Sequence, residues 1–209
     1  MATPGGRASI PRLENGDRLP GAEFMRRYEA MPGIKAELIG GVVYMASPVR
    51  HTQHGGPVGL LNLWLGTYVA GRPEESVAFG TDSTVVLDDA DRVQPDAYLL
   101  RQTVDGQAEI GEDGFIYGPP ELVCEVAAST VSLDANAKAE AYEAAGVREY
   151  LLWRTEEPRV DWYERSPAGF RPMLPVDGLI ESKVFPGLKL DPDALLRGDL
   201  PAVLEAIRG

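Results

Sequence analysis

Residues 93–100, VQPDAYLL, combine the apolar pattern of a buried strand with an aspartate directly after a proline. A carboxylate among such apolar neighbours costs free energy to bury unless a cation or a hydrogen-bond donor pairs with it. The partner of Asp96 therefore determines how this strand is packed. It also determines whether Asp96 has a structural or a chemical role.

A second acidic strand is expected at residues 121–128, ELVCEVAA. Side chains alternate between the two faces of a strand, so Glu125 faces away from Cys124, which is most simply a small core side chain. Two such strands side by side would bring Asp96 and Glu125 together. Like charges in a low-dielectric site need a proton or a cation between them. Mg²⁺ suits this pair, because it takes one or two carboxylates and keeps waters for a phosphate.

The helix expected at residues 133–146, LDANAKAEAYEAAG, adds a lysine to these acids. Helical spacing places Asp134, Lys138 and Tyr142 on the face that packs on the sheet. Lys138, near the helix start, leans toward the end of the acidic strand. A further carboxylate, Glu37, stands in the apolar setting AELIGG.

Acids and a lysine that converge at a sheet edge are typical of metal-dependent phosphodiester hydrolysis. Carboxylates hold the metal, the metal activates water, and a lysine stabilises charge on the phosphate or the water. The candidate catalytic residues are Glu37, Asp96, Glu125 and Lys138, with Asp96 and Glu125 as the expected ligands of Mg²⁺ or Mn²⁺.

The order of expected elements predicts an α/β fold with a mixed sheet flanked by helices, because it lacks a regular βαβ series. We expect helices at 21–30, 53–69 and 133–146, strands at 76–89, 92–100, 121–128 and 148–154, hairpins at 36–47 and 159–174, a loop at 101–120, a further short strand within 179–190, and one or two short C-terminal helices. Residues 1–20 read as a flexible lead-in, and 21–209 as one domain.

Composition narrows the functional classes. The net charge of −12 lowers the expectation of nucleic-acid binding, although it does not forbid a local basic groove. The single cysteine rules out an intramolecular disulfide and fits a reducing cytoplasm. No apolar run approaches the length of a membrane span, and the N-terminus lacks the apolar segment of a signal peptide.

Several of these stretches resemble the Uma family of restriction-endonuclease-like proteins, within the PD-(D/E)XK nuclease superfamily. The matching stretches are AELIGGVVYMASP, QPDAYLL, PPELVCEVAAST and the run from Asp134 to Tyr150, and together they cover about residues 22–165. The resemblance implies a restriction-endonuclease-like core, to which the hairpin expected at 159–174 is a C-terminal addition. It also implies DNA as the substrate.

By position, the resemblance makes Asp96 and Glu125 metal ligands and Glu37 a further acid of the site. Ala127 stands where the strand lysine of the superfamily is expected, and Lys138 on the following helix takes its place. The sequence departs from the family in the turn AAST, which lacks a proline, and in EYLLWR, where Leu151 replaces a tryptophan. These departures lie beside the site and concern the shape of its loops.

Other residues have weaker claims to a role. His54 matches a histidine of the resembled family, so it is a possible cleft residue, as are Asp134 and Tyr142. His51 and His54 are also compatible with a zinc pair or with a plain polar helix start. Trp64, Trp153 and Trp162 read as packing residues.

Three functional hypotheses follow. The first is a Mg²⁺-dependent endonuclease acting on DNA, which many restriction-like domains perform as homodimers. The second is a non-catalytic, homo-oligomeric binding protein on the same scaffold, which the acidic charge favours. The third, a hydrolase with Cys124 as its nucleophile, is disfavoured because Cys124 faces away from Glu125 and no histidine is placed to activate it.

Overall fold

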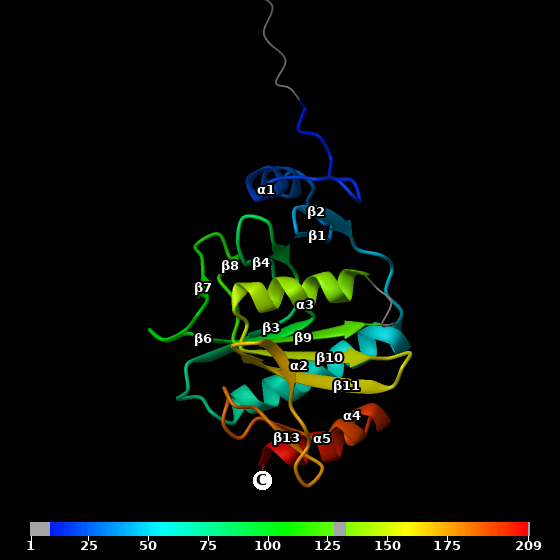
Figure 1. The fold of residues 1–209 in the computed structure, drawn as a ribbon, viewed down its shortest axis with the longest axis vertical. Coiled ribbons are helices and arrows are strands. Elements are labelled where there is room, and N and C mark those ends of the chain that lie inside the picture. Colours follow the sequence, from blue (N-terminus) through cyan, green and yellow to red (C-terminus); the bar gives the residue numbers. More distant parts are fainter. Residues whose placement is uncertain (1–8, 128–132, 209) are drawn as a thin grey trace, which may run out of the picture.

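The computed structural model describes residues 9–127 and 133–208, with side chains at 9–127 and 136–207. Helices flank a mixed β-sheet, which confirms the α/β class (Figure 1). The helices are α1 (Gly21–Glu29), α2 (Gly56–Ala70), α3 (Leu133–Ala145), α4 (Pro192–Arg197) and α5 (Leu200–Arg208). No helix among these described residues is long and apolar enough to cross a membrane.

The central sheet contains six strands in the order β12-β11-β10-β9-β6-β3. Their bounds are β3 (Val77–Gly80), β6 (Ala97–Arg101), β9 (Leu122–Ala127), β10 (Glu149–Arg154), β11 (Arg159–Ser166) and β12 (Gly169–Pro172). Only β9 and β10 run parallel, joined by the crossover helix α3, while the other neighbours pair antiparallel. The predicted C-terminal hairpin is β11–β12, and a second, smaller one is formed by β13 (Ile180–Glu181) and β14 (Lys189–Leu190).

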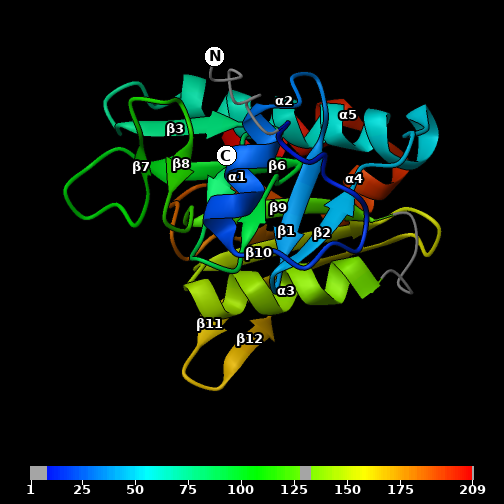
Figure 2. The same cartoon turned by 90° about the horizontal axis from the view of Figure 1, so that it is seen from above.

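Helices cover both faces of the central sheet. Figure 2 shows α2 and α5 on one side of β6, β9 and β10, and α3 on the other side. Strand β9 divides the core accordingly: Leu122, Cys124 and Val126 join the cluster beneath α2, whereas Val123 joins the cluster beneath α3. This alternation is the one that the sequence pattern predicted. The three tryptophans lie in the cluster beneath α2, as predicted.

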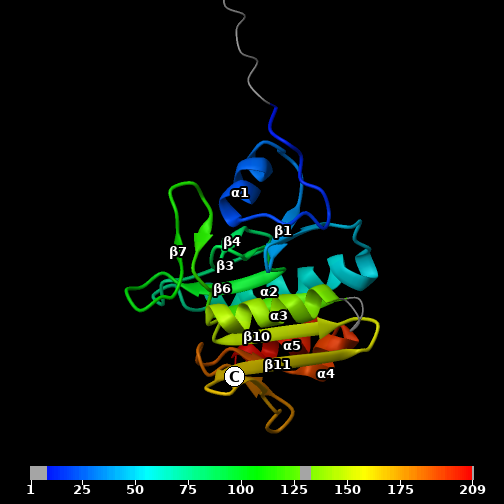
Figure 3. The same ribbon diagram turned by 45° about the horizontal axis from the view of Figure 1, so that its top comes forward.

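Helix α3 ends as its sequence predicts. Gly146 has φ 97°, a left-handed conformation that is natural for glycine, and its N–H donates to the carbonyl oxygen of Tyr142. The chain then turns directly into β10, so α3 lies lengthwise over the sheet beside β10 (Figure 3). Its first turn is near the carboxyl end of β9 (Figure 1). This orientation brings Lys138 to the strand end that carries Glu125.

A second sheet lies on the α3 side of the molecule, in the order β2-β1-β5-β4-β8-β7. Its strands are β1 (Ala36–Ile39), β2 (Val42–Met45), β4 (Val85–Val86), β5 (Arg92–Val93), β7 (Glu109–Ile110) and β8 (Ile116–Tyr117). Gly40 and Gly41 close the β1–β2 hairpin with φ of 56° and 73°, as a two-residue turn of this type requires. The stretch that we expected to be one strand, residues 92–100, therefore divides between two sheets, with Pro95 at the crossing.

Other expectations also differ from the structure. The expected strand at 76–89 divides into β3 and β4, which belong to different sheets. Residues 9–20 do not form a loose lead-in, because Leu13 is buried and backbone hydrogen bonds tie Gly16 and Asp17 to Val43. The expected loop at 101–120 contains β7 and β8, which are too short to leave a periodic pattern. The expected helix at 53–69 starts two residues earlier, with a π-helical turn, η1 (His51–Gly55).

Candidate active site

Three carboxylates from separate elements meet at one end of the central sheet. Glu37 lies in β1, Asp96 directly precedes β6, and Glu125 lies in β9. The antiparallel register of β6 and β9 sets Ala97 opposite Cys124, so the chain places Asp96 and Glu125 next to each other one step further along. The structure thus brings together the two residues that the sequence pairs.

Lys138 joins two of these acids. Its Nζ lies 2.7 Å from Oε1 of Glu125 and 2.9 Å from Oε1 of Glu37. The lysine side chain is 11% exposed, so these ion pairs are shielded from water. The helical lysine therefore lies among the acids, as the resemblance implied, rather than in solvent.

Asp96 has two partners of different kinds. Its Oδ2 accepts a hydrogen bond of 2.8 Å from the backbone N–H of Val126, and its Oδ1 lies 3.1 Å from Nε2 of His54 in η1. Burial alone would raise the pKa of Asp96, but His54 and Lys138 hold that pKa below its usual value. The same contact raises the pKa of His54. Asp96 is therefore held as a carboxylate.

Glu37 is oriented by the backbone of Gln94, next to the place where the chain passes from the second sheet to the central sheet. Its Oε1 accepts a hydrogen bond of 2.6 Å from the backbone N–H of Gln94. Pro95 follows, and because proline has no N–H the strand ladder is interrupted there. The interruption lets the chain pass from β5 to β6 and leaves Glu37 and Asp96 on either side of the crossing.

Tyr142 and Asp134 differ from the other predicted cleft residues. Tyr142 is fully buried and does not line the cleft, because its ring packs in the core beneath α3. Its hydroxyl donates a hydrogen bond of 2.6 Å to Oε1 of Glu125, so Tyr142 holds that carboxyl group in position from the core side. The side chain of Asp134 and the turn at 128–132 lie outside the described residues.

The acids of the site, Glu37, Asp96 and Glu125, outnumber Lys138 and His54 only when Glu125 is ionised. Burial raises the pKa of Glu125 to about 8, and the charges of Asp96 and Glu37 add to this rise while Lys138 opposes it. Burial would lower the pKa of Lys138, but the surrounding carboxylates outweigh it and raise that pKa. Lys138 therefore keeps its proton, and Glu125 binds a further proton below about pH 8. Once Glu125 is ionised, the buried carboxylates favour an additional cation.

These side chains line an open cleft of about 830 Å³. Its lining includes Glu37, His54, Asp96, Glu125 and Lys138, together with residues 44–50 at the end of β2 and just after it. Lys35 and Arg50 also line it, and Lys35 forms an ion pair with Asp82. Basic side chains thus accompany the acids in this cleft although the chain is acidic as a whole.

The donor set fits a hard divalent cation that retains several waters. Among residues 9–127 and 136–207, no three histidine, cysteine or acidic side chains are grouped closely enough to enclose a metal ion. Mg²⁺ does not need such an enclosure, because it is commonly bound through one or two carboxylates plus water and substrate oxygens. Asp96 and Glu125 satisfy this requirement, because Asp96 is held as a carboxylate and Glu125 becomes one when it releases its proton. Within the residues that the structure describes, His51 and His54 are not grouped with a third side chain that could complete a zinc site.

Cys124 lies on the opposite face of β9 from Glu125. It is fully buried beneath α2, and burial raises the pKa of its thiol well above the usual value. A buried, protonated thiol is a poor nucleophile. The cysteine-hydrolase hypothesis therefore has no support in the geometry.

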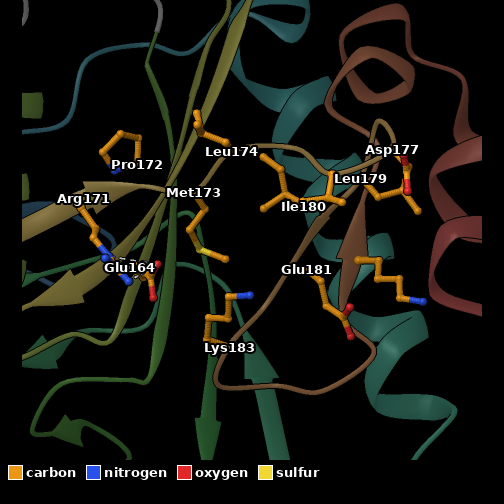
Figure 4. Close-up of a pocket in the computed structure, with 12 residues that line it drawn as sticks. Glu164, Arg171, Pro172, Met173, Leu174, Asp177, Leu179, Ile180, Glu181 and Lys183 are labelled. Atoms are coloured by element: carbon orange, nitrogen blue, oxygen red, sulfur yellow. Dashed lines mark hydrogen bonds and ion pairs between the residues drawn. The ribbon is translucent and has the colours of Figure 1, made fainter.

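A second hollow, of about 690 Å³, lies among β12, β13 and β14 (Figure 4). Met173, Leu174 and Ile180 lie around it, and Lys183 and Glu181 provide charged groups. None of the residues that line the acidic cleft lines this hollow. We therefore place the candidate active site in the acidic cleft.

Two contributors to the cleft went unnoticed in the sequence. Gln94 lines it and orients Glu37, yet a glutamine before a proline carries no distinctive signal. Tyr150 also lines it, although its position in the apolar strand REYLLWR indicates only core packing. In both residues the contact depends on strands that are distant in sequence.

Comparison with solved structures defines the class of fold. The chain is similar to a protein from Anabaena variabilis ATCC 29413 that is described as a "putative nuclease belonging to DUF820", with a TM-score of 0.65 and 15% sequence identity. The similarity covers 83% of this chain and 97% of that one, and at this identity it concerns the fold.

Comparison with protein families then identifies the chain. It belongs to the Uma2 family, described as "Putative restriction endonuclease", whose model matches residues 22–193. No curated protein matches the sequence. The family membership that the quoted motifs suggested is thereby confirmed.

Proposed function

We propose that this protein is a metal-dependent endonuclease that hydrolyses phosphodiester bonds of DNA, with Mg²⁺ or Mn²⁺ held by Asp96 and Glu125. The observation that carries the proposal is the convergence of these two acids with Glu37 and Lys138 in one cleft. Membership of a restriction-endonuclease family supports the same reaction.

The bound cation would supply Lewis-acid stabilisation of the reacting phosphate. Lys138 would orient the attacking water and offset negative charge that develops on the phosphate, since its ammonium group is buried among the acids. His54 would keep Asp96 oriented through their 3.1 Å contact. Glu37 would hold Lys138 and accept a hydrogen bond from a bridging water, or bind a second cation.

The test is cleavage of supercoiled plasmid in Mg²⁺ or Mn²⁺ by wild-type protein, by Asp96→Asn and by Glu125→Gln. We expect both variants to lose at least about a hundredfold in rate, because each removes a negative ligand without changing shape. Glu112→Gln, an exposed substitution outside the cleft, makes the same change in charge and should leave the rate unaltered. Equal cleavage by wild type and Asp96→Asn would assign the activity to another site or to a contaminant.

A non-catalytic, homo-oligomeric binding protein on the same scaffold is the alternative, and the net charge of −12 favours it. This alternative predicts that Mn²⁺ does not bind at Asp96 and Glu125. Calorimetric titration distinguishes the two functions: Mn²⁺ binding that disappears in Glu125→Gln excludes the alternative.

We further propose that the protein acts as a homodimer in the cytoplasm. A dimer would present two clefts to the two strands of a duplex, and the one cysteine is a buried free thiol, which is compatible with a reducing compartment. Light scattering coupled to size exclusion, with and without a DNA duplex, measures the mass. A monomeric mass under both conditions would contradict the dimer.

A further inference from the structure

The hydroxyl group of Tyr150 is buried and has no hydrogen-bond partner among the described residues. Tyr150 is 2% exposed, yet it lines the cleft that contains Glu125 and Lys138. Leaving a buried hydroxyl unpaired costs free energy, and such a group in a native protein calls for a ligand or an ordered water. The orphaned hydroxyl indicates that its partner enters the cleft.

The register of the strands places this tyrosine beside the acids. Strand β10 runs parallel to β9, with Tyr150 paired to Val123 and Leu152 paired to Glu125. Alternate residues of a strand share a face, so Tyr150 lies on the same face as Glu125, on the neighbouring strand. The side chain is therefore one strand away from the carboxylate that we assign to the metal.

Aromatic packing fixes the position of the ring. Its centroid lies 5.6 Å from that of Tyr142, 5.7 Å from that of Phe170 and 6.2 Å from that of Tyr163. A side chain held on three sides loses little freedom when a ligand binds, which makes it a preorganised donor. The fixed ring and the unpaired hydroxyl of Tyr150 are more typical of a preorganised binding group than of a side chain that only packs in the core.

The hydroxyl can act only as a neutral donor or acceptor at neutral pH. Burial raises the pKa of Tyr150, and the charge of Glu125 raises it further, so the group keeps its proton. Glu125 already accepts hydrogen bonds on Oε1 from Tyr142 and Lys138. No described residue accepts the proton of Tyr150, so the hydroxyl can donate to an acceptor brought by a ligand, and an anionic oxygen is the strongest acceptor of this kind.

We propose that Tyr150 binds the substrate by donating a hydrogen bond to a non-bridging phosphate oxygen, an assignment that rests on the proposed nuclease function. In this arrangement Tyr150 and Lys138 contact the phosphate from two elements, β10 and α3. Because the donor is neutral, it adds no charge to a site that already holds several ionised groups. It contributes orientation and hydrogen bonding.

The test compares Tyr150→Phe with Tyr163→Phe. Tyr163 belongs to the same aromatic group and is not among the residues that line the cleft, so its substitution is a matched control. In Mg²⁺ we expect kcat for plasmid cleavage to fall about 10- to 100-fold in Tyr150→Phe and to stay within about twofold of wild type in Tyr163→Phe. Mn²⁺ affinity should be the same in all three proteins.

Thermal unfolding of the metal-free proteins separates substrate binding from a structural role. Removing a hydroxyl that has no partner should not lower Tm, so Tyr150→Phe should be at least as stable as Tyr163→Phe. A clearly lower Tm in Tyr150→Phe would reveal a structural partner and overturn the proposal. Unchanged kcat in Tyr150→Phe, with active wild-type protein, would overturn it as well.

Wild-type protein that cleaves no DNA would refute the proposed function, and binding would then decide the role of Tyr150. The probe is a labelled DNA duplex followed by fluorescence anisotropy in Ca²⁺. Affinity that falls at least about tenfold in Tyr150→Phe, but not in Tyr163→Phe, supports the phosphate contact without catalysis. Equal affinity in both variants, or no binding by wild type, overturns the contact.

Discussion

The protonation of Glu125 should make metal binding at the site depend on pH. In the metal-free protein its carboxyl group binds a proton below about pH 8 and releases it above, because burial and the neighbouring acids raise its pKa. A divalent cation binds the carboxylate form, so metal binding below pH 8 must release this proton. Metal affinity should therefore increase with pH until the carboxyl group is ionised in the free protein.

Calorimetry measures this pH dependence directly. We expect the Mn²⁺ affinity of the wild type to rise up to about tenfold per pH unit from pH 6 to about 8 and then to level off. Glu37→Gln removes a neighbouring negative charge, so it should lower the pKa of Glu125 and bring the plateau to a lower pH. Affinity that does not change with pH would contradict the raised pKa.

Lys138 supplies the positive charge that offsets the free-energy cost of burying the carboxylates of Glu37 and Glu125. Lys138→Met keeps most of the side-chain volume but leaves Glu37 and Glu125 without their cation. We expect the free energy of unfolding, measured in urea without metal at about pH 9, where Glu125 is ionised, to fall by about 3–5 kcal/mol. The deficit should shrink as the pH falls, because the carboxylates then bind protons.

The exposed residue Lys183 provides the control for this measurement, because Lys183→Met makes the same chemical change outside the acidic cleft. We expect that variant to stay within about 0.5 kcal/mol of wild type. Equal stability of Lys138→Met and Lys183→Met would mean that the buried acids do not depend on the lysine.

At the scale of elements, Glu149 ties the C-terminal segment to the central sheet. This fully buried side chain at the start of β10 accepts hydrogen bonds from the hydroxyl of Ser182 and from the N–H groups of Lys183 and Val184, at 2.6–3.1 Å. Glu149→Ala removes the acceptor of the Ser182 hydroxyl and the Lys183 N–H, whereas the Val184 N–H keeps its contact with Oγ of Ser182. We expect a loss of about 2–4 kcal/mol in the free energy of unfolding in urea.

Glu164 is the cross-strand partner of Glu149 in β11 and is the matched control. It pairs with Arg171 at the surface, and such exposed ion pairs contribute little. We expect Glu164→Ala to cost less than about 1 kcal/mol. Comparable losses in the two variants would show that the buried contacts of Glu149 do not anchor the segment.

The elements with a strong local pattern were predictable from sequence. Alternation in ELVCEVAA gave the faces of β9, and the terminating Gly146 gave the end of α3, because both depend on neighbouring residues. The two-residue strands β7 and β8 were not predictable, since they exist only through pairing with each other and with β4. The packing of residues 9–20 on β2 likewise depends on contacts that are distant in sequence.

At the scale of the whole molecule, the candidate site was only partly predictable. The proximity of Asp96 and Glu125 followed from two acidic strands, provided that these strands are neighbours. Helical spacing indicated Lys138, the apolar setting indicated Glu37, and the resemblance gave both a role in the site. Their positions in the structure agree with that expectation, while their catalytic roles remain predictions. Tyr150 was missed because its value as a donor appears only when its hydroxyl is seen without a partner.

The overall charge of the protein affects how strongly it binds DNA. With a net charge of −12 and a surplus of acids in the cleft, the metal-free protein should repel a polyanion, although Lys35 and Arg50 line the same cleft. We expect fluorescence anisotropy to give at least about tenfold tighter binding of a duplex in Ca²⁺ than in EDTA. Arg50→Ala should weaken binding for all sequences and reduce its salt dependence. Equal affinity in Ca²⁺ and EDTA would contradict this view.

The most direct test of the account locates the metal itself. Crystals grown with Mn²⁺ and measured near the manganese absorption edge would show an anomalous difference peak at each bound ion. We expect a peak between the carboxyl groups of Asp96 and Glu125, which is lost in crystals of Glu125→Gln. No peak in the cleft, or a peak only at a surface cluster such as Asp88 and Asp89, would contradict it.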